Sequence, residues 1–148
     1  MEKAVEGLRA AEKLFQDGYY EDAVSRAYYA MYHAARAALS IVNVFPKTHE
    51  GVVAEFGRKF VLTGIFEKEL GKNLAHVKAA RETYEYTVAT VLKPEAEAIL
   101  RNAQNFVKTV KKYLEKLASW LVRCTKDALG ALNGLSGVHP QKPSPLEV

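Results

Sequence analysis

Arg81 is the residue whose position most suggests a binding or catalytic role, because it interrupts an otherwise apolar helical stripe. Alternating steps of four and three from Leu70 give a stripe in which every other member is apolar or aromatic: Leu70, Leu74, Val77, Arg81, Tyr84, Val88 and Val91. An arginine keeps its charge at any ordinary pH, and an unpaired buried charge costs several kcal/mol. Arg81 must therefore pair with a carboxylate, reach a solvent-filled cleft between helices, or bind an anion.

Two carboxylates of the same segment, Glu85 and Glu82, could pair with Arg81. An isolated pair within one helix contributes little stability, so it is a weak reason to bury a charge. Both interpretations stay open: an internal ion pair that joins two helices, or an arginine that binds phosphate. Tyr86 could approach Arg81 only if the helix ends or distorts near Glu85. The β-branched sequence TVATV that follows Tyr86 favours such an end.

Segment 20–42 carries a second polar face, spaced at steps of three and four: Arg26, Tyr29, His33, Arg36 and Ser40. The face either packs against a neighbouring helix or forms a positive wall with aromatic platforms, which suits bases and phosphates. The four histidines are scattered, without the helical spacing or the carboxylate cluster of a metal site: His33, His49, His76 and His139. We therefore expect no metal and no cofactor.

Four or five helices must position these side chains, and no strand pattern competes with them. We expect helices over 2–16, over 20–42, from Thr48 through Phe60, from Phe66 onward with a pattern that weakens after Tyr84, and from Pro94 onward. Their boundaries lie at Asp17–Gly18, 43–47, Thr63–Gly64 and Lys93–Pro94. The inner stripe of the second helix is Val24, Tyr28, Met31, Ala35, Leu39 and Val42. Long seams with short connections predict an all-α, antiparallel up-and-down bundle.

The composition fits one bundle with a C-terminal extension. The chain has 148 residues, of which 49% are hydrophobic, enough for a single core. We place the bundle at 1–118 and the extension at 119–148, with one short helix through Leu129 and then a disordered end, HPQKPSPLEV. The net charge of +4 permits an anionic partner. With Cys124 as its only cysteine, no signal peptide and no apolar span, the chain is expected to be cytoplasmic and to have no membrane partner.

Three ordered blocks resemble the HEPN superfamily: AYYAMYHAARAAL (27–39), KTHEGVVAEFGRKFVLTG (47–64) and RETYEY (81–86). The chain is most similar to its small archaeal and bacterial members with a KTHxG motif and an Arg-x4-Tyr end, over about residues 3–118. The resemblance implies a bundle of four to five helices that is commonly a homodimer. Many such proteins are encoded beside a minimal nucleotidyltransferase, and the two form a toxin–antitoxin pair.

Other members of the superfamily are metal-independent ribonucleases with an Arg-x4–6-His signature. In these, the His assists attack by the ribose 2′-hydroxyl and the Arg stabilises the charged phosphorane. The resemblance assigns the signature Arg to Arg81, but Tyr86 stands where the His is expected. A tyrosine, with a pKa of about 10, is a poor base at neutral pH, although it can donate a hydrogen bond to phosphate.

We therefore predict a module that binds a nucleotide or an RNA phosphate and partners a nucleotidyltransferase. The predicted ligand-binding residues are Arg81, Tyr86, Tyr84, His49, Lys47, Arg36 and His33. A metal-independent ribonuclease is the alternative, with Arg81, Tyr86 and His49 as the catalytic candidates. That activity would need His49 or His33 to be brought from another helix. A purely structural bundle, in which Arg81 only closes an ion pair, is the third possibility.

Overall fold

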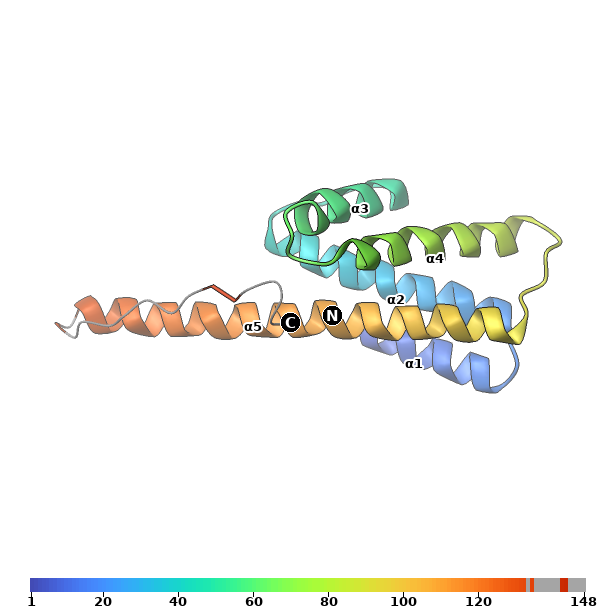
Figure 1. Cartoon of the computed structure of the whole chain (residues 1–148). Helices are drawn as coiled ribbons and strands as arrows, with labels where there is room; N and C mark the ends of the chain where they lie inside the picture. Colours follow the sequence, from blue (N-terminus) through green and yellow to red (C-terminus); the bar gives the residue numbers. More distant parts are fainter. Residues whose placement is uncertain (133, 135–141, 144–148) are drawn as a thin grey trace.

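The computed structural model describes residues 1–132, 134 and 142–143, and within them the secondary structure is entirely helical. Helices α1 (Glu2–Gln16) and α2 (Tyr20–Ile41) form a hairpin, and α3 (His49–Phe56) continues into the π-helical turn η1 (Gly57–Val61). Helices α4 (Lys68–Tyr86) and α5 (Lys93–Leu132) complete the bundle (Figure 1). The predicted all-α bundle is confirmed.

The helix ends follow the local chemistry of the sequence. Gly18 and Gly64 adopt positive φ angles of 86° and 77°, which glycine tolerates without strain. Thr48 caps α3, because its side-chain oxygen accepts a hydrogen bond from the Gly51 amide at 3.0 Å. These stops were predicted, and they fix where α2, α3 and α4 begin relative to one another.

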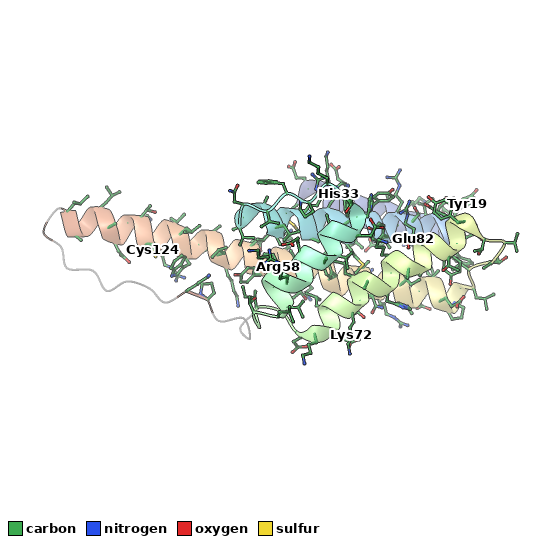
Figure 2. The ribbon with its side chains drawn as sticks, turned by 90° about the horizontal axis from the view of Figure 1, so that it is seen from above. Tyr19, His33, Arg58, Lys72, Glu82 and Cys124 are labelled. Atoms are coloured by element: carbon green, nitrogen blue, oxygen red, sulfur yellow. The ribbon has the colours of Figure 1, made fainter. Side chains whose placement is uncertain are left out.

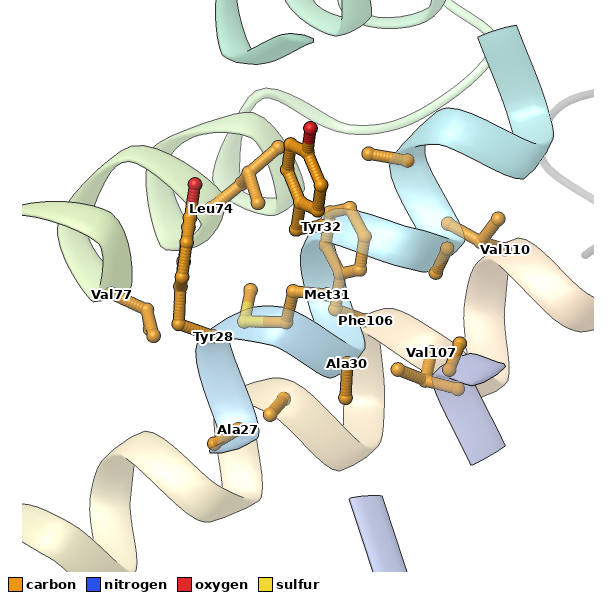
Figure 3. Packing of buried hydrophobic residues seen from close by; sticks show 14 of the residues in the cluster. Ala27, Tyr28, Ala30, Met31, Tyr32, Leu74, Val77, Phe106, Val107 and Val110 are labelled. Atoms are coloured by element: carbon orange, nitrogen blue, oxygen red, sulfur yellow. The ribbon is translucent and has the colours of Figure 1, made fainter. Parts of the chain in front are cut away.

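Helix α2 is the central element, since it packs against α1, α3, α4 and α5. Its buried side chains Tyr28 and Met31 lie among Leu74 and Val77 of α4 and Phe106 of α5 (Figure 3). Tyr28 and Tyr32 rise side by side from α2 in this view, with their hydroxyl oxygens pointing the same way. The core therefore presents a polar edge toward α3 and α4, where the candidate site lies.

Two apolar members of the predicted stripes are exposed. Val42 follows the end of α2, and Val88 follows the end of α4; both side chains are exposed. The helical period no longer applies once the backbone leaves the helix, so the spacing that placed them inward was misleading. Val91 is buried although it also lies in the connection to α5.

Helix α5 does not end near Ser119, where the bundle was predicted to end and the C-terminal extension to begin. It runs unbroken to Leu132, and its second half projects beyond the other helices (Figure 1). Figure 2 shows Cys124 on this projecting part. Residues 119–129 contain no Pro or Gly, so nothing in them breaks a helix that the bundle has already nucleated. The predicted disordered end, 139–148, lies outside the described residues except at 142–143.

Among the described residues, no helix combines the length and the apolar character needed to cross a membrane.

Candidate functional site

Arg81 is held in an ion pair with Glu85, one turn further along α4. The Arg81 Nε donates to Glu85 Oε1 at 3.0 Å, and Nη2 donates to Oε2 at 2.7 Å. The hydroxyl of Ser25 on α2 also donates to Glu85 Oε1, at 3.2 Å. The Arg81 side chain is 14% exposed and that of Glu85 34%. Of the two predicted carboxylates Glu85 is thus the partner, while Glu82 binds Lys78.

Two tyrosine rings of α2 form the surface on which the Arg81 guanidinium lies. Its Cζ is 4.9 Å from the ring centre of Tyr29 and 5.3 Å from that of Tyr28. A cation over an aromatic face is stabilised by about 0.5–1 kcal/mol at exposed sites, and more where water is excluded. Arg81 is therefore held to α2 directly through these rings, and indirectly through Glu85, which accepts from Ser25.

His49, the first residue of α3, also contacts Tyr28. Its Nδ1 lies 2.7 Å from the Tyr28 hydroxyl, and its ring stacks on Tyr32 with centres 4.4 Å apart. Burial raises the pKa of Tyr28 well above its ordinary value, although the positive charge of Arg81 opposes this shift. Tyr28 thus stays neutral, with its hydroxyl hydrogen-bonded to His49 and its ring against Arg81. We call these three residues, with Tyr29 and Tyr32, the Arg81 cluster.

Lys78 keeps the start of α3 against α4 and so fixes the place of His49. Its ammonium bridges Glu50 of α3, at 3.0 Å, and Glu82 of α4, and its side chain is only 13% exposed. The hydrogen bond to Glu82 is the main cause that raises the pKa of Lys78, and the bond to Glu50 adds to it. The hydrogen bond from the Gly51 amide to the Thr48 side chain also stabilises this first turn of α3.

The comparison with known proteins identifies the family of this site. The family model for the HEPN domain matches residues 1–113, which contain α1 to α4, the Arg81 cluster and the first half of α5. The chain belongs to the HEPN family.

Similar proteins occur in archaea and bacteria. The Methanocaldococcus jannaschii protein named "Putative toxin MJ0605" is 40% identical over 117 residues, covering 79% of this chain and 87% of the relative. A second protein of that organism, "Putative toxin MJ0142", is 35% identical over 115 residues, covering 77% and 78%. A Thermotoga maritima "UPF0332 protein" is 33% identical over 116 residues, covering 78% and 88%. The projecting half of α5 lies beyond the HEPN match.

The tyrosines near the end of α4 lie differently from one another in this HEPN domain. Tyr86 is the last residue of the helix and is 79% exposed. Tyr84 packs against the core and binds Glu95 of α5; burial, followed by this carboxylate, raises its pKa. Tyr84 is therefore engaged with α5, and Tyr86 is the one that faces solvent beside Glu85.

The remaining predicted residues lie along α2 and before α3. Arg36 places its Cζ 5.7 Å from the ring centre of Tyr32, and the ring of His33 meets Tyr32 edge-on at 5.6 Å. Both thus touch the ring on which His49 stacks. Lys47 is exposed in the connection between α2 and α3.

Sequence reasoning missed three members of the site. Tyr28 was placed in the inner stripe of the second helix, and neither Tyr32 nor Ser25 was given a role. The available signal was that a buried tyrosine hydroxyl needs a hydrogen-bonding partner. In an all-helical core, the histidine at the start of the next helix is a natural candidate for that partner.

Proposed function

We propose that this HEPN protein binds the phosphate of a nucleotide or an RNA through the Arg81 cluster. In this proposal it is the toxin-class member of a two-protein module in the cytoplasm, partnered by a minimal nucleotidyltransferase. The observation that supports this proposal is that two helices meet at Tyr28. Arg81 of α4 lies against its ring, and His49 of α3 is hydrogen-bonded to its hydroxyl. The names of the two archaeal relatives support the toxin class.

The guanidinium can bind phosphate by exchanging one anion for another. Glu85 occupies Nε and Nη2, so Nη1 is the nitrogen left for an incoming oxygen. The Glu85 side chain is about one-third exposed and can turn into solvent when a phosphate takes its place. A planar guanidinium holds phosphate in the same two-pronged geometry as carboxylate. The rings of Tyr28 and Tyr29 keep it oriented during the exchange.

Adenosine monophosphate should raise the melting temperature of the protein, and adenosine should not. A ligand at a hundred times its Kd stabilises the folded state by about 2.7 kcal/mol, which raises Tm by about 5 °C or more in a chain of this size. Differential scanning fluorimetry over a ligand series measures the effect. Adenosine is the control because it lacks only the phosphate. Equal shifts with both ligands, or none with either, would contradict a phosphate site.

A ribonuclease is the second candidate, and the position of His49 favours it. A tautomer in which His49 Nδ1 donates to the Tyr28 hydroxyl leaves Nε2 unprotonated, and Nε2 could then accept the proton of a ribose 2′-hydroxyl. Arg81 would stabilise the charge on the phosphorane as the 2′-oxygen attacks phosphorus and the 5′-oxygen leaves. This assignment supplies, from α3, the histidine that is missing after Arg81.

Cleavage of single-stranded RNA should persist in EDTA and should yield 2′,3′-cyclic phosphate ends. DNA of the same sequence should stay intact, because it lacks the 2′-hydroxyl. Electrophoresis of labelled strands measures both, with His49→Gln as the variant expected to lose cleavage. Cleavage that His49→Gln leaves unchanged would point to another base or to a contaminating nuclease.

We also propose that the protein is a homodimer, as the family resemblance implies. Light scattering coupled to size-exclusion chromatography measures its mass.

A further inference from the structure

A groove runs between α1 and α2. It consists of two hollows of about 620 and 480 Å³ that share Lys3 and His33 in their walls. The first extends to Arg36, Ser40 and Pro46, and the second to Arg26 and Tyr29. Tyr29 thus contacts Arg81 with its ring and also lines the groove.

Basic side chains from both helices line this groove along its length. Arg26 and Arg36 lie ten residues apart on α2, about 15 Å at a rise of 1.5 Å per residue, and both are exposed. Lys3 faces them from α1, and the acidic residues of the lining are Glu2 and Glu6. The pKa of His33 is lowered first by burial and then by Lys3 and Arg36. The lining thus holds three basic and two acidic side chains, and Lys3 and Arg36 act on His33 at its middle.

Aromatic surface accompanies the charges. Tyr29 lines one hollow, and Phe45, 66% exposed, lines the other beside Pro46. The ring of His33 lies between these ends, in the shared wall. Bases stack on such rings, while arginines and lysines bind the phosphates between them. An acidic peptide would use the charges but would leave Phe45 without a role.

We propose that the α1–α2 groove binds a segment of single-stranded RNA, with Lys3, Arg26 and Arg36 on its phosphates. About 15 Å of helix axis separates the backbones of the two arginines, more than one nucleotide spans, so we take the ligand to be an oligonucleotide. Tyr29 lines the groove and its ring contacts Arg81, so in this proposal a strand in the groove passes within one side chain of Arg81. This inference rests on the proposed function, since it names a path for the RNA whose phosphate the Arg81 cluster would hold.

The test is fluorescence anisotropy with a fluorescein-labelled hexaadenylate RNA, titrated with protein at several salt concentrations. Each phosphate contact on a single strand contributes about −0.7 to the slope of log K against log [salt]. The double variant Lys3→Ala/Arg26→Ala should weaken binding at least about tenfold in 0.1 M salt and make the slope shallower by about 1.4. A double variant with the same loss of charge, Arg58→Ala/Arg101→Ala, is the control, since both residues are exposed and outside the groove.

The outcomes separate the groove from the Arg81 cluster. The groove variant should keep the full thermal shift with adenosine monophosphate, because Lys3 and Arg26 are not part of the Arg81 cluster. The groove is disproved if both double variants bind hexaadenylate equally, or if wild-type protein binds it no tighter than adenosine monophosphate. Loss of the mononucleotide response in wild-type protein overturns the proposed function instead. Displacement of the RNA by hexaglutamate at equal concentration would show an acidic-peptide site and overturn the RNA assignment.

The titration of His33 gives an independent readout. Phosphates in the groove should raise its pKa, because the cations that now lower it would be neutralised. Proton NMR of the ring, with and without hexaadenylate, measures the shift. An unchanged His33 titration under saturating RNA would place the strand elsewhere. The charged groups around His33 are the N-terminal amino group, Lys3, Glu2 and Glu6 of α1, and Arg26 and Arg36 of α2.

Discussion

Arg81→Met should remove the response to adenosine monophosphate while leaving the protein folded. The affinity should fall at least about tenfold, equal to about 1.4 kcal/mol, because a hydrogen bond to a charged group contributes about that much or more. Stability should change by less than about 1 kcal/mol. The methionine can lie on the rings of Tyr28 and Tyr29 through its sulfur, and Glu85 keeps Ser25 as a partner and partial access to water.

Two further variants make this result specific. Arg58→Met removes an arginine that pairs with Glu55 at 2.7 Å in the same intrahelical manner, but on an exposed surface, and it should leave the response unchanged. Glu85→Gln should strengthen binding, since it removes the carboxylate that competes with phosphate for Arg81. If Arg81 only closes an ion pair, Arg81→Met and Glu85→Gln will both leave the ligand response as it is. Calorimetric titration of the variants decides between these cases.

The helices could be predicted from the sequence because their signals are local. Gly18 and Gly64 end helices by a backbone conformation that only a few residues tolerate, and Thr48 begins one by a single side-chain bond. The π-helical turn after Phe56 could not be predicted, because the extra residue it accommodates leaves Phe56 and Phe60 both buried, as an ordinary helix would. The full length of α5 was not predicted, because the change in composition near Ser119 was taken as a boundary although it does not break a helix.

Only part of the candidate site could be predicted, because only its local contacts leave a signal in the sequence. Arg81 and Glu85 were found because a charge in an apolar stripe demands a partner within a few residues. The contact between Tyr28 and His49 joins α2 to α3 across a connection whose path the periodicity does not describe. A sequence pattern shows that Tyr28 is buried, but it does not show which helix end meets its hydroxyl. Predicting a site where several helices meet therefore requires knowledge of how the helices pack as well as the sequence pattern.

Phe106→Ala should destabilise the bundle by about 3–5 kcal/mol, the range for truncating a fully buried aromatic side chain. Phe106 on α5 has no exposed surface and lies 5.2 Å, centre to centre, from Phe56 at the end of α3. Its loss would leave a cavity between α5 and the two helices that carry Tyr28 and His49. Urea unfolding followed by circular dichroism measures the change as a lower midpoint at constant slope. The stability of a typical domain is 5–15 kcal/mol, so this variant loses a large share of it.

Leu121→Ala is the matched control, because Leu121 lies on the same helix but in the half that projects beyond the bundle. Its side chain is exposed, so its truncation should change stability by no more than about 0.5 kcal/mol. The pair of variants thus compares burial within one helix, with backbone and propensity held nearly equal. A loss at Leu121 as large as that at Phe106 would mean that the projecting half of α5 is buried in the native assembly. The midpoint should then rise with protein concentration, because association would contribute to folding stability.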